Sequence, residues 1–408
     1  MSRLEELIQQ YCPDGVEYRS LGDVCIFADG FPLKADDIKG QGIYPVVKIG
    51  NINNGVVDAQ DCYLTSLPSK VKTSQILSGG EILVGMSGST GKTGYSVLQN
   101  AIVNQRIAII RNNDLVLNGY LKHSLVNNNF ESYCFQKGTG PQHNISKFDL
   151  LSYKIPVPPL PVQEEIVRIL DAFTELQAEL QAELQKRKQQ YNYYLDNLLS
   201  FNSEGQAEVR WMKLKDVATQ WYRGAGIKRE EVSEDGMPCI RYGEIHTTYN
   251  IWFDDCISHT DESKQVSRKY AEKGDILFAI TSEDIPFIGN SVAYLGDERI
   301  LVGGDIVVMK HNQDPKYMAY ALSTSDAIKQ KGKGKVKSKV VHTNVPSLQE
   351  IVIPIPSMTE QKRIASILDR FDTLTNDLTS GLPAEIEKRR QQYEYYRDKL
   401  LTFKRKEA

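Results

Sequence analysis

The chain has 408 residues, of which 41% are hydrophobic and 25% are charged, and its formal net charge is −3. This length leaves room for two or three domains, and the composition is ordinary for a globular protein. The charge excludes a surface coated in positive charge, and no apolar run reaches the roughly 20 residues that a membrane helix needs.

The N-terminus and the cysteines indicate the compartment. The first ten residues, MSRLEELIQQ, contain no apolar core of a signal peptide. The six cysteines show no C-x-x-C spacing, which predicts reduced thiols and neither a disulfide framework nor a zinc site. We therefore expect a cytoplasmic protein that does not associate with membranes.

The first 150 residues alternate short apolar runs with Gly and Asn turns. The runs YPVVKIG (44–50), EILVGM (81–86) and AIVNQRIAII (101–110) predict strands, and GYLKHSL (119–125) predicts a short helix. This mixture is typical of an α+β domain.

A long helix follows this mixed segment. We expect it to run from Val162 to Leu199, because the prolines up to Pro161 prevent a helix from starting earlier. Its middle, residues 175–185, repeats a four-residue unit of good helix formers. Its apolar residues recur every three or four positions, as in a coiled-coil seam: Ile166, Ile169, Phe173, Leu176, Leu180, Leu184, Tyr191, Tyr194 and Leu198.

The rest of the chain repeats the first half. Residues 186–201 and 388–403 are identical at eleven of sixteen positions. Three further pairs keep the same order at offsets between 193 and 202 residues: 15–24 with 208–217, 79–87 with 273–281, and 155–173 with 353–371. The segment KYMAYAL (316–322) predicts the matching short helix. We infer a tandem repeat of about 200 residues, with pseudo-twofold symmetry.

The second long helix differs from the first in its middle. Gly381 and Pro383 should break or kink it, and it is four residues longer between Phe371 and Lys388. Four residues add about one turn, so the apolar face stays aligned. That face consists of Ile364, Ile367, Phe371, Leu374, Leu378, Ile386, Tyr393, Tyr396 and Leu400.

This arrangement resembles the specificity subunit of type I restriction–modification enzymes over nearly the whole chain. The resemblance rests on the two proline-led helix starts, the KRxQQYxYYxDxLL pair and GxILxxxS/T in each half. It implies two mixed α/β target-recognition domains, residues 1–154 and 204–352. It also implies a central spacer helix (155–203) and a C-terminal one (353–408), which pack antiparallel as a coiled coil.

The resemblance also implies a function. Each domain would read half of a bipartite site on double-stranded DNA, and the repeat in residues 175–185 would set the distance between the halves. The helices would dock two modification (methyltransferase) subunits and, through the complex, the restriction (translocase–nuclease) subunits. The chain itself would be non-catalytic, and S-adenosylmethionine, ATP and Mg would belong to the partner subunits.

Motifs of enzymes are missing from the residues themselves. The segment GMSGSTGKT (85–93) approaches a phosphate-binding loop, but Met86 stands where that loop needs Gly. The sequence has no H-E-x-x-H, and its six histidines lack metal-ligand spacing. These absences disfavour a stand-alone DNA enzyme.

Three loops in each half carry the residue types that read base edges. They are 48–55, 87–96 and 136–147 in the first half, and 241–250, 281–291 and 329–344 in the second. The predicted DNA-binding residues of the first half are Lys34, Lys48, Asn51, Asn53, Ser87, Ser89, Thr90, Lys92, Gln142, His143, Asn144 and Lys147. Those of the second half are Lys228, Arg229, Arg241, Tyr242, Glu244, His246, Thr281, Ser282, Lys333, Lys335, Lys337, His342 and Asn344.

Each of these residues also has a plainer explanation. Asn, Gly and Ser mark turns, and the lysine run at 329–339 is either a solvated loop or a set of phosphate contacts. Glu244, Glu283 and Asp284 either accept from cytosine amino groups or are surface charges. The recurrence of all three loops in both halves favours DNA over a protein-binding adaptor, which remains the alternative function.

The tyrosines of the repeated helical segment are more numerous than one seam can bury. Tyr193 and Tyr395 lie two residues from the tyrosines of the seam and so face elsewhere. They pack either on the neighbouring recognition domain or on a modification subunit. The predicted partner-binding residues are Tyr193, Tyr194, Tyr395 and Tyr396.

Overall fold

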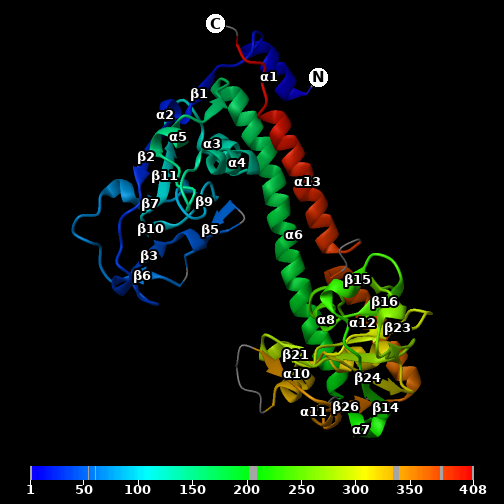
Figure 1. Ribbon diagram of the computed structural model, residues 1–408. Helices are drawn as coiled ribbons and strands as arrows, with labels where there is room; N and C mark the ends of the chain where they lie inside the picture. Colours follow the sequence, from blue (N-terminus) through cyan, green and yellow to red (C-terminus); the bar gives the residue numbers. More distant parts are fainter. Residues whose placement is uncertain are drawn as a thin grey trace. The chain divides into compact units, whose positions relative to one another are not determined.

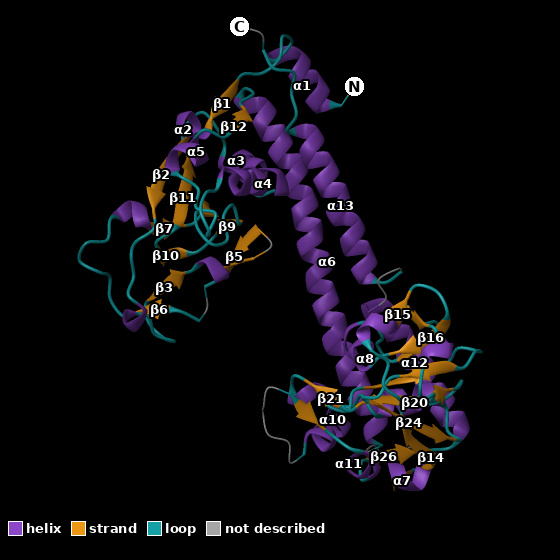
Figure 2. Ribbon diagram, viewed as in Figure 1, coloured by secondary structure: helices purple, strands orange, loops and turns teal. Residues whose placement is uncertain are grey.

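The computed structural model describes residues 2–53, 55–59, 61–201, 209–333, 340–376 and 380–406. The chain forms two compact units (Figure 1). The first unit comprises residues 1–179 and 388–408, and the second comprises residues 180–387. Each unit combines strands and helices (Figure 2), which confirms the predicted fold class of two mixed α/β domains with long helices.

The described residues of the first unit form three sheets. The order of the six-stranded sheet is β2 (Cys25–Asp29), β11 (Ile107–Asn112), β8 (Glu81–Gly85), β9 (Thr93–Ser96), β5 (Gly55–Val57) and β4 (Ile52–Asn53). A four-stranded sheet has the order β6 (Tyr63–Leu64), β3 (Tyr44–Val47), β10 (Gln99–Val103) and β7 (Ile76–Ser78). The third sheet pairs β1 (Tyr18–Ser20) with β12 (Lys154–Pro156).

Helices contribute to the apolar core on one face of the six-stranded sheet. They are α1 (Arg3–Tyr11), α2 (Leu21–Val24), α3 (Asn118–Leu125), α4 (Asn128–Lys137), α5 (Lys147–Leu151), the first half of α6 (Leu160–Ser200) and the end of α13 (Leu382–Leu400). Short 3₁₀ turns are η1 (Ala35–Asp37), η2 (Ile49–Asn51) and η3 (Thr73–Gln75).

The central strands of this sheet separate two apolar cores. Along β8, Ile82 and Val84 join the core beneath the helices, whereas Leu83 joins the core on the opposite face. The same alternation occurs in β11, where Ile109 pairs with Leu83. Successive side chains of a strand point to opposite faces, so a fully apolar run is what a sheet buried on both faces requires.

The second unit repeats this plan. One five-stranded sheet has the order β14 (Ala218–Arg223), β24 (Ile306–His311), β20 (Ile276–Ala279), β22 (Ser291–Tyr294) and β17 (Trp252–Phe253). The other has the order β15 (Val232–Ser233), β18 (Ser258–Thr260), β16 (Met237–Ile240), β23 (Ile300–Val302) and β19 (Tyr270–Ala271). Two-stranded sheets pair β13 (Arg210–Lys213) with β26 (Val352–Ile355) and β21 (Thr281–Ser282) with β25 (Val341–His342).

Most helices of the second unit follow the order of those of the first, and α8 (Tyr242–Thr247) stands where the first unit has the 3₁₀ turn η2. The helices are α7 (Leu214–Val217), α8, α9 (Pro315–Ala321), α10 (Ser325–Gly332), α11 (Val345–Gln349), α12 (Met358–Asn376) and the second half of α6. Its 3₁₀ turns are η4 (Arg229–Glu231), η5 (Glu262–Lys264) and η6 (Ile285–Phe287). The predicted helices at 119–125 and 316–322 are confirmed as α3 and α9.

The two halves close their domains in the same way. In the first unit Arg19 pairs with Ile155 across β1 and β12, and in the second unit Met212 pairs with Ile353 across β13 and β26. These strands lie in the segments that the sequence repeat matched, so the predicted duplication is confirmed in the fold.

A buried glutamine joins the long helix to each domain. The Gln163 side chain is fully buried; its Oε1 accepts from the Leu117 amide (2.9 Å), and its Nε2 donates to the carbonyls of Leu115 and Pro158 (3.0 and 2.7 Å). Gln361 occupies the equivalent place in the second unit. It accepts from the Asp314 amide (3.0 Å) and donates to the Pro356 carbonyl (2.9 Å) and the Gln313 side chain (2.8 Å).

The long helices differ from the prediction in detail. Helix α6 begins at Leu160, so the expectation that it starts after Pro161 is wrong, because a proline fits the first turn, where its missing N–H needs no partner. The predicted break around Gly381 and Pro383 is confirmed. Helix α12 ends at Asn376 and α13 begins at Leu382.

The predicted apolar stripe of α6 is only part of its buried face. Ile166 and Tyr191 are buried, but Leu176 is 36% exposed. Val162 and Leu170, which lie outside that stripe, are fully buried in the core of the first unit. Both the recognition domain and the partner helix therefore bury residues of α6. A seam between two helices alone does not explain which residues of α6 are buried.

Candidate nucleic-acid interface

The three predicted loops of the first unit come together. The middle loop (87–96) contacts the first loop where Lys92 Nζ donates to Asn53 Oδ1 (3.1 Å). It contacts the third loop where the amide of Gly88 donates to the Gln142 carbonyl (2.9 Å). Ser87 Oγ also donates to Gln142 Oε1 (3.2 Å). Asn53 and Gln142, which are far apart in sequence, thus share one surface.

The second unit brings its three loops together in the same order. His246 Nε2 bonds the Thr281 carbonyl (2.9 Å), which joins the first and middle loops. The middle and third loops pair as β21 and β25, with Thr281 opposite His342. The amide of Thr343 donates to the Ile280 carbonyl (2.9 Å), as that of Ile145 donates to the Met86 carbonyl in the first unit (3.0 Å). Matching backbone bonds therefore hold both sets of loops.

The predicted loops are partly regular structure: 93–96 belong to β9, 329–332 end α10, and most of 241–250 is a helix. Residues 242–247 form α8, and the prediction of a loop over 241–250 is wrong there. The Glu244 carboxylate caps the helix by accepting from the Arg241 amide (3.0 Å). This N-terminal cap stabilises a segment whose Gly and β-branched residues have low helix propensity.

Some candidate side chains hold the loops in place. Asn51 Oδ1 accepts from the Lys48 amide (2.8 Å), Thr90 donates to the His143 carbonyl, and Asn344 caps α11 by accepting from the Ser347 amide (2.9 Å). Thr90, Thr281 and Ser282 are buried. For these residues the contacts agree with a role in stabilising the turns, which was the alternative to DNA binding.

Glu244 is held inside the domain. Its side chain accepts from the Arg241 guanidinium (3.1 and 3.2 Å) and from Ser258 Oγ (2.7 Å), and the residue is 5% exposed. The alternative that Glu244 is a surface charge is therefore wrong. Its predicted contact with a cytosine amino group would require these bonds to be exchanged.

The other candidates are at least partly accessible, apart from two outside the described residues. The exposed ones are Lys34, Asn53, Ser89, Gln142, His143, Asn144, Lys147, Lys228, Arg229, Tyr242, Lys333 and His342. The half-buried ones are Lys48, Ser87, Lys92, Arg241 and His246. Lys335 and Lys337 lie outside the described residues. Lys147 lies 4.4 Å over the ring of Phe27 in β2.

Arg106 was missed by sequence reasoning. It lies in the turn between β10 and β11, has a left-handed backbone (φ 70°), and is exposed. Its Nη1 donates to Gln142 Oε1 (3.2 Å), and its carbonyl accepts from the Met86 amide (2.8 Å). The run Asn104-Gln105-Arg106 could have indicated it, because it places three residue types that read base edges in the turn between two strands.

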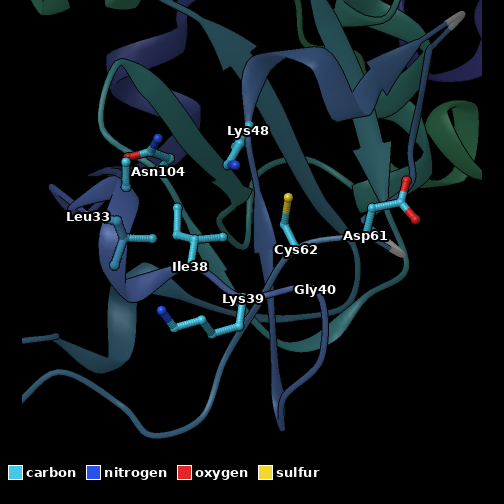
Figure 3. Close-up of a pocket in the computed structure, with 9 residues that line it drawn as sticks. Leu33, Ile38, Lys39, Gly40, Lys48, Asp61, Cys62 and Asn104 are labelled. Carbon is cyan, nitrogen blue, oxygen red and sulfur yellow. The ribbon is translucent and has the colours of Figure 1, made fainter.

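A cavity of about 320 Å³ borders the first loop (Figure 3). Lys48, a predicted DNA-binding residue, lines it together with Lys39 and Asn104. Leu33 and Ile38 form an apolar part of the wall. The cavity places a second lysine, Lys39, beside the converging loops.

The four predicted partner-binding tyrosines separate into two kinds. Tyr194 stacks on Phe371 (ring centroids 5.2 Å apart) and Tyr396 stacks on Phe173 (5.4 Å), so these two face a neighbouring helix. Tyr193 and Tyr395 are 65% and 61% exposed. The alternative that this second pair is buried on a recognition domain is wrong.

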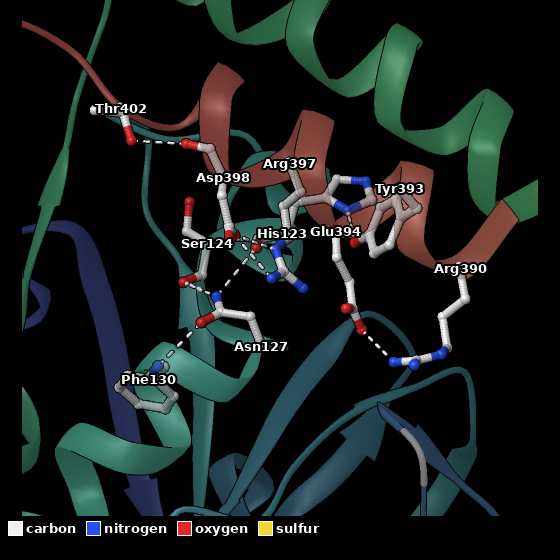
Figure 4. Close-up of polar contacts among 10 residues, drawn as sticks. All are labelled: His123, Ser124, Asn127, Phe130, Arg390, Tyr393, Glu394, Arg397, Asp398 and Thr402. Atoms are coloured by element: carbon white, nitrogen blue, oxygen red, sulfur yellow. Dashed lines mark hydrogen bonds and ion pairs between the residues drawn. The ribbon is translucent and has the colours of Figure 1, made fainter. Parts of the chain in front are cut away.

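A polar network joins α3 to α13 in the first unit (Figure 4). Buried His123 bonds the Tyr393 hydroxyl through Nδ1 (2.8 Å) and Asp171 Oδ1 through Nε2 (2.9 Å). Lys122 Nζ shares the same carboxylate oxygen (2.9 Å). Burial lowers the pKa of His123 to about 4, an effect that Lys122 reinforces and Asp171 opposes. Neutral imidazole satisfies both contacts, with Nε2 donating to Asp171 and Nδ1 accepting from Tyr393.

This network predicts a loss of stability in acid. The pKa of His123 is lower in the folded chain than its ordinary value of 6.5. The unfolded chain therefore binds more protons between pH 6.5 and pH 4, and the free energy of unfolding falls as pH falls through this window. We expect a loss of up to about 3 kcal/mol near pH 4, measured by urea unfolding from pH 4 to pH 7 and followed by circular dichroism.

The control is His123→Gln, which cannot titrate. It should show a weaker pH dependence than the native chain while remaining less stable at pH 7. An identical pH dependence in the variant would contradict the assignment to His123.

The described part of the chain, residues 2–53, 55–59, 61–201, 209–333, 340–376 and 380–406, bears on two further kinds of site. Those residues contain no group of three or more His, Cys, Asp or Glu side chains arranged to hold a metal ion. Among the helices built from them, none has both the length and the apolar character needed to cross a bilayer.

Comparisons with known proteins identify the family. The profile of the type I restriction modification DNA specificity domain matches residues 13–187 and 207–388. The type I restriction enzyme EcoR124I/EcoR124II specificity subunit of Escherichia coli is 35% identical over 283 residues, which cover 67% of this chain and 69% of that protein. A putative type I restriction enzyme specificity subunit of Haemophilus influenzae, S.HindORF215P, is 32% identical over 80% of this chain and 83% of its own length.

A solved structure has the same fold. The S subunit of a type I restriction–modification system from M. genitalium superposes with a TM-score of 0.54 over 95% of this chain and 96% of its own, at 17% identity. Two copies of the specificity domain, two units of matching topology and the long helices agree with one another. The chain belongs to the family of type I restriction–modification DNA specificity subunits.

Proposed function

We propose that the chain selects the DNA site of a type I restriction–modification complex, with the loops of each unit reading one half of a bipartite site. The observation that carries this proposal is the convergence of three loops in each unit. In both units a middle loop bonds the other two, through Gln142 and Lys92 in one and through Thr281 in the other. A duplicated surface of this kind suits two half-sites on one ligand.

The residues of this surface divide into two classes by their chemistry. Asn53, Ser89, Gln142 and Arg106 are exposed in the first unit and have the donors and acceptors that read base edges. Lysines at the margin, such as Lys48 and Lys39, suit phosphate contacts, which position the protein without reading sequence.

We propose that this subunit is non-catalytic and delivers its site to partner subunits. Two modification subunits and the restriction subunits would supply the chemistry, with S-adenosylmethionine, ATP and Mg bound there. The exposed Tyr193 and Tyr395 lie in equivalent copies of one segment, as docking of two identical subunits requires. We place the complex in the cytoplasm, which agrees with six unpaired cysteines.

A salt titration separates DNA recognition from an adaptor role. The logarithm of the Kd of the purified complex for its duplex should rise linearly with the logarithm of the salt concentration. The slope should be about 0.9 for each phosphate contact. Lys48→Gln, which removes one of the lysines assigned to phosphate, should lower this slope by about 0.9, the contribution of one contact. Lys154→Gln, an exposed lysine on β12 outside the loops, is the matched control and should leave it unchanged. Binding without salt dependence, or none at all, would favour the adaptor and refute the proposal.

A further inference from the structure

The middle loop of the second unit is longer than its counterpart. In the first unit the Gly91 amide closes the loop on the Gly85 carbonyl (2.8 Å), with five residues (86–90) between them. In the second unit the Gly289 amide closes on the Ala279 carbonyl (3.0 Å), with nine residues (280–288) between them. The position that precedes the closing Gly by two is Ser89 in one unit and Phe287 in the other.

The additional residues build a rigid support for Phe287. They form the 3₁₀ turn η6, in which the Phe287 amide donates to the Asp284 carbonyl (3.3 Å). Pro286 fixes its own φ within this turn, and the next side chain, Ile288, is fully buried. The Phe287 side chain is nevertheless 56% exposed.

The surroundings of Phe287 indicate what it contacts. The preceding Glu283 is exposed, and a carboxylate is repelled by phosphates, so the tip of this loop does not suit the DNA backbone. In the major groove a carboxylate accepts from the cytosine amino group, and an apolar side chain packs on the thymine methyl group. Both features of the tip therefore match base edges in the major groove.

We propose that Phe287 packs on a thymine C5-methyl group in the half-site read by the second unit. This inference rests on the proposed function, because it assumes that the loops face DNA. It makes Phe287 a specificity-determining residue with no counterpart in the first unit, where Ser89 lacks an apolar surface.

Replacing thymine by uracil removes only the methyl group and so tests the contact. The duplex is the recognition site of the complex, identified by mapping methylation in cells, with each thymine replaced singly by uracil. For the native complex we expect at least one such replacement, confined to one half-site, to weaken binding about fourfold, which corresponds to one buried methyl group. Phe287→Ala should weaken binding to the thymine duplex and abolish sensitivity to that replacement.

Two variants complete the test. Phe287→Leu should retain most of the discrimination, because it keeps an apolar side chain, and Ser89→Ala should leave the sensitivity to that thymine unaltered. The inference is overturned if no uracil replacement depends on Phe287. It is also overturned if 2-aminopurine beside the site brightens with the native complex but not with Phe287→Ala, because Phe287 would then unstack bases as a wedge. If the native complex shows no salt-dependent DNA binding at all, the proposed function itself is refuted.

Discussion

Inserting one further Leu-Gln-Ala-Glu unit after Glu179 in α6 is expected to lengthen the non-specific gap between the half-sites by one or two base pairs. Helix α6 is continuous from Leu160 to Ser200, and four residues add about 6 Å to a helix. DNA rises about 3.4 Å per base pair along a strand. The inserted residues are strong helix formers, so the added turn should remain helical.

Mapping of methylated sites in cells that carry the variant complex would measure the gap. Methylation at the original site should be lost, and both half-site sequences should stay the same, because no loop residue is altered. Glu179→Gln, an exposed substitution at the same place, keeps the helix length and should keep the original gap. A variant that methylates the original site with its gap unchanged would refute the spacer role of α6.

Gln163→Leu is expected to destabilise the first unit by about 4 kcal/mol. The substitution leaves the Leu117 amide and the carbonyls of Leu115 and Pro158 buried without their partner. Each unpaired buried group costs about 1–3 kcal/mol, and part of this cost is relieved by local rearrangement. Hydrogen exchange should show the loss as faster exchange of the α3 amides, on the order of a thousandfold.

The second unit supplies the matched comparison. Gln361→Leu should act on the amides of α9 and leave those of α3 protected, because Gln361 bonds the segment that precedes α9. Gln181→Leu, at an exposed position of α6, should change neither helix. Equal loss of protection in α3 and α9 from Gln163→Leu would show that the glutamine does not act locally.

The sequence predicted those parts of the fold whose signals are local. The short helices α3 and α9 and the break before Leu382 follow from residue patterns within a few turns of chain, and the duplication follows from comparing the chain with itself. The buried face of α6 was predicted less well. Leu170 is buried by a domain whose position relative to the helix depends on tertiary packing, which periodicity alone does not specify.

The candidate site was predicted as a set of loops and not as a surface. Nothing near Met86 in sequence indicates that its backbone bonds Arg106 and Ile145, so Arg106 could not be grouped with the loops. Helix α8 was missed because its stability comes from the capping carboxylate of Glu244 and not from helix propensity. The contacts of individual residues with DNA remain predictions.

The paired strands β1 and β12 have an evolutionary consequence. Tyr18 lies opposite Pro156, so the chain enters and leaves the first recognition domain at adjacent positions, and Arg210 and Ile355 do the same for the second. A domain whose two ends are adjacent can be exchanged as a unit, because the replacement domain must reproduce only the two short strands at the junction. Genetic recombination within the repeated segments can therefore replace one half of the recognised site and leave the other half and the helices intact.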